Sequence, residues 1–351
     1  MAVRRILLED CVGQSRAVAC DDTGRPVALW LDRWSDGPHR PHRPRTGDVR
    51  EARLRKFDPS QGGAFAELAG GSGEAFVRVP PGLGITEGQA VQLRIEAEAR
   101  EGKLPRAAIV FDTPLHRAGF DDWLRRLPGG PDAAVETVPP GSPDVDAAFE
   151  DALSPDVQIP GGGRMRIERA AALTAADIDT SGRTGRGSAA SRALQVNSAA
   201  AAELARQCSL RSLGGLLVLD CVAPLNQDAG RKVRDAFLSA WRRISQRTAK
   251  AEPPSVFGLM EASLAWGETP LAERLLDETG APSPETLCLT GLRRLQAALG
   301  RNSMDRPTLR LPTAAHAWMM ASGLDLTAAL AEKHGNRFDI VAAEIPQPEV
   351  A

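Results

Sequence analysis

The stretch Gly214-Gly-Leu-Leu-Val-Leu-Asp-Cys-Val222 is the most informative part of the sequence for the fold. A glycine pair opens it, an apolar run follows, and one acid, Asp220, lies near its end. A short apolar run bounded by a turn is typical of a buried strand. Helical spacing of apolar residues precedes it from Leu194 to Cys208, and a second helix is predicted over 228–247. Alternating strands and helices of this kind predict an α/β sheet.

A second acid-bearing strand precedes this run. The sequence predicts strands over Arg164–Ala170 and Ala172–Ile178, and Asp177 and Asp179 lie two residues apart, so they face the same way. Ligands of α/β sheets favour the carboxyl ends of strands, so we expect these acids to gather near Asp220. Protons or a divalent cation must then offset their repulsion, and oxygen ligands favour Mg²⁺ or Mn²⁺. The alternative is structural, because such an Asp often caps a helix or pairs with Arg.

Residues 48–110 are predicted to form a small all-β unit. Turns rich in Gly and Pro separate five short apolar stretches, a pattern that fits an OB-type barrel. The five stretches are Val49–Leu54, Gly63–Leu68, Ala75–Val79, Ala90–Ile95 and Ala107–Phe111.

The rest of the chain is predicted to contain strands, helices and loops. A Pro- and Arg-rich connector, residues 35–47, leads into the β unit, and the run from His39 to Lys56 is either a solvated linker or a contact for RNA backbone. The other predicted elements are strands over 4–8 and 16–31 with a turn at 21–24, helices over 119–127 and 145–153, a loop over 128–143, a strand over Val256–Ala262 and an α+β unit over 281–351.

Composition excludes several classes of protein. The chain has 351 residues, 42% of them hydrophobic, and a net charge of −2, so it has no global basic field. Its five cysteines form no C-x-x-C pair, which argues against a disulfide framework or a cysteine zinc site. No run of 18 apolar residues and no signal-peptide core occur, so we expect a cytoplasmic protein without a membrane segment.

Two stretches resemble the catalytic core of the ribonuclease E/G family. They are Ala175-Ala-Asp-Ile-Asp-Thr-Ser-Gly-Arg183 and the segment that begins Asn197-Ser-Ala-Ala-Ala-Ala-Glu-Leu-Ala-Arg-Gln and ends Leu-Gly-Gly-Leu-Leu-Val-Leu-Asp220. The resemblance implies that Asp177 and Asp220 are the catalytic, metal-binding aspartates and that Asp179 and Asn197 orient the site. It also implies an endoribonuclease that uses Mg²⁺ (or Mn²⁺) to cleave single-stranded RNA, leaving 5′-phosphate products, in RNA processing or decay. From its position alone, Asn197 could instead cap a helix.

The resemblance extends to most of the chain and implies its domain organisation. Ile6-Leu-Leu-Glu-Asp10 resembles the family's opening strand, and Val256-Phe-Gly-Leu-Met-Glu261 resembles its F-G-L-[LV]-E segment. The implied fold is α/β, with RNase H-like and DNase I-like sheets, an inserted S1-type (OB) barrel and a small C-terminal domain. The implied units are residues 1–43 and 111–160 (a split RNase H-like subdomain), 44–110 (the S1-type domain), 161–275 (the DNase I-like catalytic domain) and 281–351 (the C-terminal domain).

Four residues of the β unit are candidate RNA contacts by the same resemblance. Phe65 and Phe76 lie in segments similar to the family's base-stacking strands, and Lys103 and Arg106 lie in Gly102-Lys-Leu-Pro-Arg106, which resembles K-G-P-R. Exposed aromatic residues on OB-type faces commonly stack bases, and cations contact phosphate. The alternatives are that the two phenylalanines form the barrel core and that the two cations lie on a solvated turn.

Several departures from the family pattern weaken parts of this interpretation. No 5′-sensor segment is found between Phe111 and Ala147, so cleavage is expected not to depend on a 5′-phosphate. The C-P-x-C zinc link is missing, so no zinc is expected, and the expected homodimer loses its best-defined contact. Ala223 replaces a family aspartate, and Ala262–Gly267 replaces a basic segment. A catalytically weak or inactive RNA-binding protein on the same scaffold is the alternative, and an interaction scaffold built on the C-terminal unit is the third hypothesis.

Overall fold

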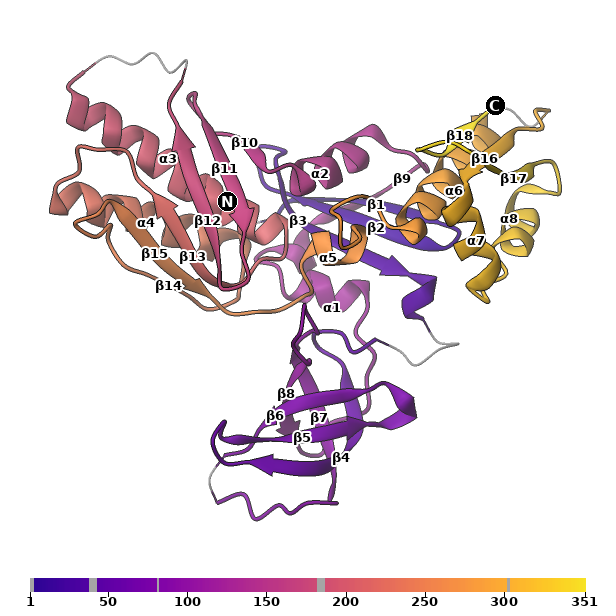
Figure 1. Cartoon of the computed structure of the whole chain (residues 1–351), viewed down its shortest axis with the longest axis horizontal. Coiled ribbons are helices and arrows are strands. Elements are labelled where there is room, and N and C mark those ends of the chain that lie inside the picture. Colours follow the sequence, from indigo (N-terminus) through magenta and orange to yellow (C-terminus); the bar gives the residue numbers. More distant parts are fainter. Residues whose placement is uncertain (1–2, 38–42, 81, 182–186, 302–303) are drawn as a thin grey trace.

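The computed structural model describes residues 3–37, 43–80, 82–181, 187–301 and 304–351. Within these ranges the chain forms a four-stranded sheet, a closed five-stranded barrel, a six-stranded sheet and a three-stranded sheet. The barrel projects from a body in which the six-stranded sheet and the C-terminal unit lie at opposite ends (Figure 1). The prediction of a mixed α/β protein with an inserted barrel is confirmed, and the finer family assignments of the sheets stay predictions. None of the helices in the described ranges has the length and apolar character to cross a bilayer.

The N-terminal sheet has the order β3-β2-β1-β9. The predicted strand over 16–31 is two strands, which flank the expected turn, and the predicted loop over 128–143 is wrong because it contains β9. Strand β9 lies at the sheet edge with mostly exposed side chains, so no apolar run marks it, and only its parallel pairing with β1 defines it. The elements of this part are β1 (Arg5–Cys11), β2 (Gln14–Cys20), β3 (Pro26–Arg33), α1 (Phe120–Arg125), β9 (Ala134–Val138) and α2 (Pro143–Leu153).

The barrel confirms the five predicted strands of the β unit. Alanine, leucine, valine and isoleucine side chains fill its interior, and the small alanines let five short strands close around so narrow a core. The strands are β4 (Val49–Asp58), β5 (Gly63–Leu68), β6 (Glu74–Arg78), β7 (Ala90–Ala97) and β8 (Arg106–Val110).

The six-stranded sheet has the order β10-β11-β12-β13-β15-β14. Its strands alternate buried and exposed residues, because α3 and α4 pack on one face and leave the other open. Strands β12 and β13 are parallel and are connected through α3. The elements are β10 (Asp156–Gln158), β11 (Arg164–Arg169), β12 (Leu173–Asp179), α3 (Ala189–Leu210), β13 (Gly215–Asp220), α4 (Gln227–Ile244), β14 (Ala249–Ala251) and β15 (Leu259–Leu264).

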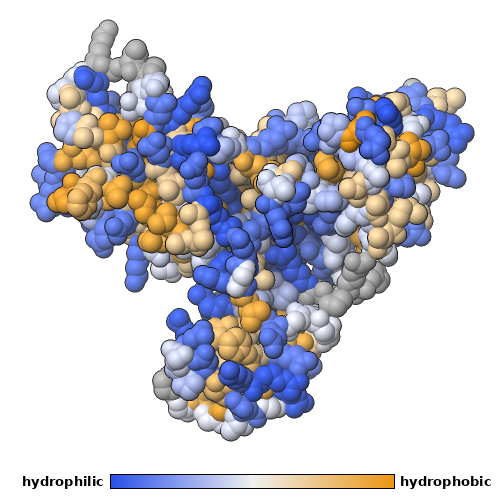
Figure 2. Space-filling view, viewed as in Figure 1, coloured by the Kyte–Doolittle hydropathy of each residue, from blue (hydrophilic) through white to orange (hydrophobic). Residues whose placement is uncertain are grey.

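Strand β15 begins three residues later than predicted. Residues 255–258 form a turn instead, closed by a hydrogen bond from the Gly258 N–H to the Ser255 carbonyl. Val256 and Phe257 on this turn are exposed, as is Leu216 on β13. Figure 2 shows apolar surface over this end of the molecule.

The C-terminal unit is α+β, as predicted. A three-stranded sheet packs on three helices around a leucine-rich core. Its elements are α6 (Pro284–Arg301), β16 (Thr308–Pro312), α7 (Thr313–Ala321), α8 (Leu326–His334), β17 (Asp339–Ala343) and β18 (Glu349–Val350), and the short α5 (Leu271–Leu275) precedes them.

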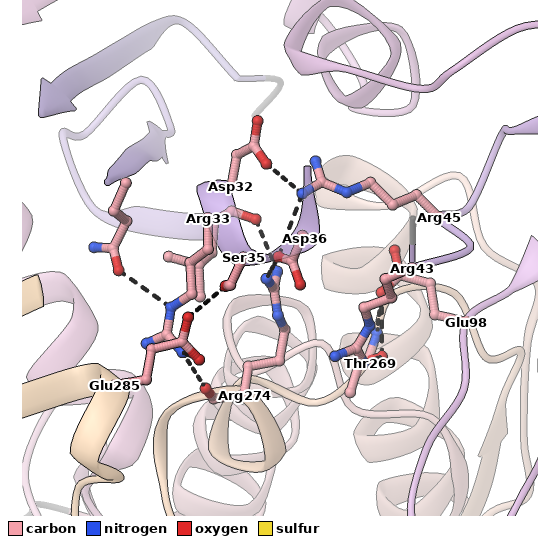
Figure 3. Close-up of polar contacts among 12 residues, drawn as sticks. Asp32, Arg33, Ser35, Asp36, Arg43, Arg45, Glu98, Thr269, Arg274 and Glu285 are labelled. Carbon is pink, nitrogen blue, oxygen red and sulfur yellow. Dashed lines mark hydrogen bonds and ion pairs between the residues drawn. The ribbon is translucent and has the colours of Figure 1, made fainter. Parts of the chain in front are cut away.

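A buried polar cluster, which we call the junction, ties these units together (Figure 3). Asp36, next to β3, accepts hydrogen bonds from both Arg45 of the connector and Arg274 of α5. Glu98, at the end of β7, accepts hydrogen bonds from the backbone and side chain of Thr269, each 3.1 Å long. Removing one partner of such a buried pair costs about 3–5 kcal/mol, so the junction fixes the barrel relative to the body.

Three arginines of the run from His39 to Lys56 therefore have a structural role. Arg43 donates to the Thr269 hydroxyl, Arg45 pairs with Asp32, and Arg50 pairs with Asp48 at 2.7 Å. Neither a solvated linker nor a free RNA-binding run describes these residues. The histidines of the same run, His39 and His42, lie outside the described residues.

Candidate active site

Asp177 and Asp220 are direct neighbours across the parallel strands β12 and β13. Register partners of this kind lie about 4.8 Å apart and point to the same face. Both aspartates are exposed, whereas Ala176, Ile178 and Leu219 beside them are buried under the helices. The two carboxylates therefore lie side by side on the open face, at the carboxyl ends of their strands.

The structural alternatives for these two aspartates are wrong within the described part of the chain. Ser188 caps α3 and Asn226 caps α4, so neither Asp177 nor Asp220 caps the helix that follows it. Arg166 is the register partner of Asp177, yet its ion pairs are with Asp156 at 3.2 Å and Glu168 at 2.7 Å. The described residues give neither Asp177 nor Asp220 an ion pair.

Asp179 lies on the same face as Asp177 but is used by the local backbone. Its Oδ1 accepts hydrogen bonds from the Ser181 backbone N–H at 2.8 Å and from the Ser181 hydroxyl. These bonds lower the pKa of the Asp179 carboxyl. Asp179 thus shapes the turn after β12 and stays ionised at neutral pH.

Asn197 is fully buried in the interior of α3, eight residues from its start, so the capping alternative is wrong. Its amide makes two hydrogen bonds to Val222: Nδ2 donates to the carbonyl at 2.8 Å, and Oδ1 accepts from the N–H at 2.9 Å. Val222 follows Asp220 by two residues. This pair of hydrogen bonds, which we call the clamp, therefore fixes the backbone immediately after Asp220.

Few side chains that could bind a metal lie at the carboxyl ends of β12 and β13. Among the described residues, no group of three or more His, Cys, Asp or Glu side chains converges as a metal site. Cys221 follows Asp220, but burial, with the charge of Asp220 beside it, raises the pKa of its thiol to about 12. That thiol stays protonated near neutral pH, so the chemistry of this edge rests on the two carboxylates.

The barrel places three of its four predicted RNA contacts in one row on its outer face. Phe65 and Phe76 are register partners, and their rings meet edge to face at 5.7 Å between centroids. Lys56 lies opposite Phe65, and Arg106 lies opposite Phe76. We call these four residues the aromatic row. Both phenylalanines are only partly buried and lie outside the barrel interior, so the alternative that they form its core is wrong.

The position of the Phe76 ring depends on Gly63. A Cβ on Gly63 would lie 2.4 Å from Cζ of the Phe76 ring, so only glycine leaves room for the ring at this point of β5. The space over Gly63 is thus part of the aromatic surface.

Lys103 is separate from the aromatic row. It lies on the exposed turn between β7 and β8, facing a pocket between the barrel and the six-stranded sheet. Arg100, Arg169 and Trp266 line the same pocket and were not predicted. The sequence held an indication of this pocket: a tryptophan lies in the segment that departs from the family pattern, and a glycine pair opens β13.

Comparison with known proteins is consistent with this geometry. The sequence profile described as "Ribonuclease E/G family" matches residues 141–264, which include both strands that carry Asp177 and Asp220. Ribonuclease E of Haemophilus influenzae is 36% identical over 123 residues, and that of Escherichia coli is 35% identical over 119. Ribonuclease G of E. coli is 30% identical over 118 residues.

These alignments cover 34% of this chain. They cover 13% of the Haemophilus protein, 11% of E. coli ribonuclease E and 24% of ribonuclease G, so only a small part of each relative is matched. The barrel and the C-terminal unit lie outside the matched profile. The similarity to the ribonuclease E/G family therefore lies in residues 141–264, which include the six-stranded sheet and its two helices.

Proposed function

We propose that this protein is an endoribonuclease that cleaves single-stranded RNA with a divalent cation, Mg²⁺ or Mn²⁺, held by Asp177 and Asp220. The observation that carries the proposal is the pairing of these two exposed carboxylates in register on adjacent parallel strands. Mg²⁺ is commonly bound by only one or two carboxylates, with water and substrate phosphate as its other ligands. A pair without a third acid suits that mode of binding.

The residues around the pair have distinct roles in this proposal. Asp177 and Asp220 hold the cation, Asn197 fixes the backbone behind Asp220, and Asp179 shapes the turn behind Asp177. A bound cation would offset phosphate charge and activate water. Attack of water on the scissile phosphorus, with departure of the 3′ oxygen, leaves a 5′-phosphate on the downstream product.

Single-stranded RNA is the proposed substrate because of the aromatic row. Phe65 and Phe76 offer ring surfaces on which bases stack without regard to sequence, and Lys56 and Arg106 flank them with positive charge. No 5′-sensor segment is needed for such binding. Linear and circular RNA are therefore expected to be cut alike.

The test is cleavage of a labelled RNA that contains single-stranded and structured parts, in Mg²⁺, Mn²⁺ or EDTA. Wild type, Asp177→Asn and Asp220→Asn are compared with Asp156→Asn as the matched control. Asp156 lies on the same open face, but Arg166 already neutralises it. Metal-dependent cuts that only the first two substitutions remove would support the proposal, and cuts that persist in Asp220→Asn would refute it.

An RNA-binding protein without cleavage activity is the second candidate. The small donor set favours it, because the described residues bring only two carboxylates together and Ala223 supplies no third. RNA binding without cleavage in any divalent metal would favour this candidate over the first.

A further inference from the structure

A pocket of about 300 Å³ lies between the barrel and the six-stranded sheet. It opens at the amino ends of β12 and β13, the opposite end of these strands from Asp177 and Asp220. The barrel contributes the turn between β7 and β8, and the sheet contributes the turn between β11 and β12. The residues that matter here are Arg100, Lys103, Arg169, Leu173, Leu216 and Trp266.

Trp266 forms one wall of this pocket, and the glycine pair that opens β13 makes room for it. A Cβ on Gly214 would lie 2.8 Å from the indole ring, and one on Gly215 would lie 3.0 Å from it. The guanidinium of Arg100 lies over the ring at 4.4 Å from its centroid, and that of Arg169 at 5.9 Å. The ring therefore positions two cations, from the barrel and from the sheet, at one place.

The positive charge of the pocket is incompletely neutralised. Arg169 has an ion pair with Glu273, and Glu101 also lines the pocket, but within the described ranges Arg100 has no ion pair and Lys103 is exposed. Burial and then the positive charge of Arg106 lower the pKa of the Arg100 guanidinium. At the junction, by contrast, Arg45 and Arg274 share the carboxylate of Asp36. An anion bound between Arg100 and Lys103 would relieve the repulsion among these cations.

We infer that this pocket binds a backbone phosphate of the RNA, at a fixed distance from the bond that is cut; the inference rests on the proposed function. Arg106 ends the aromatic row, and its charge acts on Arg100 of the pocket, so an RNA strand that leaves the row reaches the pocket next. From Leu173 to Asp177 the sheet runs four residues, or about 13 Å. That length corresponds to about four nucleotides stacked at roughly 3.4 Å each. The pocket thus sets the position of the cut relative to the bound phosphate.

The first test measures binding of a labelled single-stranded RNA in EDTA at several salt concentrations. Each lost phosphate contact lowers the slope of log K against log salt by about 0.7 for a single strand. Arg100→Gln and Lys103→Gln are each expected to weaken binding about 5- to 10-fold at low salt and to lower the slope by that amount. Arg301→Gln, an exposed arginine of the C-terminal unit, is the matched control and should leave both quantities unchanged.

The second test moves one neutral methylphosphonate linkage along the RNA, with a 2′-O-methyl group beside it for stability. In wild type, we expect the neutral linkage to weaken binding at one position, a few nucleotides from the cut. At that position it should also spread the cleavage over several neighbouring bonds. In Arg100→Gln the same linkage should have no further effect, because the contact is already absent. Equal losses in both proteins at every linkage would overturn the inference.

The outcomes separate this inference from the proposed function. A wild type that binds no RNA would overturn both. A wild type that binds and cuts RNA, with Arg100→Gln, Lys103→Gln and Trp266→Ala unchanged in slope and cleavage position, would overturn only the pocket. If the pocket variants lose binding only to RNA that carries a 5′-monophosphate, the result would also contradict a contact with the RNA backbone. Thermal unfolding of each variant checks that the fold is kept, and Lys103→Gln is the variant least coupled to folding because its side chain is exposed.

Discussion

The barrel and the six-stranded sheet each leave one β surface open, and the two surfaces differ in chemistry. On the barrel, two phenylalanine rings lie between Lys56 and Arg106. On the sheet, the comparable row holds Asp177 and Asp220. The first surface suits a polyanion with bases, whereas the second repels one unless a cation intervenes. In the proposed function, binding and chemistry thus belong to separate units, and the junction determines how far apart they are.

The largest expected effect separates the two surfaces directly. Asp220→Asn removes a charge from the sheet and leaves the barrel untouched, so cleavage should fall by at least about 100- to 1,000-fold while RNA binding changes little. Single-turnover cleavage and fluorescence anisotropy on the same RNA measure both quantities. Asp156→Asn is the control, and a parallel loss of binding in Asp220→Asn would contradict the separation.

The reverse experiment alters the barrel alone. Replacing Phe65 and Phe76 with alanine removes both stacking platforms, each worth about 1–3 kcal/mol per base, so binding should weaken by roughly 5-fold or more per ring. Cleavage at saturating protein should stay near that of wild type. Phe111→Ala, an exposed aromatic beyond the row, is the control. Unchanged affinity in the double variant would remove the aromatic row from the RNA path.

A smaller effect is expected behind Asp220. Asn197→Ala breaks both hydrogen bonds to Val222 and leaves partly buried backbone groups unpaired, so the free energy of unfolding should fall by about 1–3 kcal/mol. Cleavage should fall as well, because the backbone after Asp220 is no longer fixed. Urea unfolding and cleavage rates test this together. Asn226→Ala is the control: it removes only the cap of α4, costs about 1 kcal/mol, and should spare cleavage.

The smallest expected effect concerns α1, which lies where the barrel joins the body. Although burial raises the pKa of Asp122, hydrogen bonds from the Gly119 N–H, Arg125 and His116 outweigh it and lower the pKa to about 2. A lowered folded pKa gives stability that is present above the unfolded value, about 3.9, and is lost as pH falls toward 2. Between pH 5 and 2, the free energy of unfolding of wild type should fall by on the order of 1–2 kcal/mol more than that of Asp122→Asn. If urea unfolding shows the same acid sensitivity for both proteins, the stabilising role of the ionised Asp122 carboxylate would be contradicted.

The sequence predicted best what depends on local pattern. The five barrel strands have apolar stretches separated by Gly and Pro, and β12 and β13 have apolar runs that end in acids, so their positions were predicted correctly. The short strands β9 and β14 were missed, because three to five residues with exposed or partly buried side chains carry no periodicity. Their existence depends on pairing with distant strands.

The same limit applies to the site. The adjacency of Asp177 and Asp220 follows from parallel strands joined by a helix, so their meeting could be expected. The clamp between Asn197 and Val222 and the pocket around Trp266 depend on tertiary contacts that no spacing encodes. The connector arginines were misinterpreted because spacing does not show which partners a side chain meets: Arg45 pairs with Asp32 and Asp36, and Arg43 donates to Thr269.

The strand register has a consequence for how this protein behaves while it is being made. The two carboxylates come from separate strands, and a slip of one residue would turn one of them into the apolar layer beneath α3 and α4. A partly folded chain therefore has no assembled site, even though both aspartates are already present in it. If the proposed function holds, a newly synthesised chain, surrounded by RNA that it should not cut, would become active only once its core has closed.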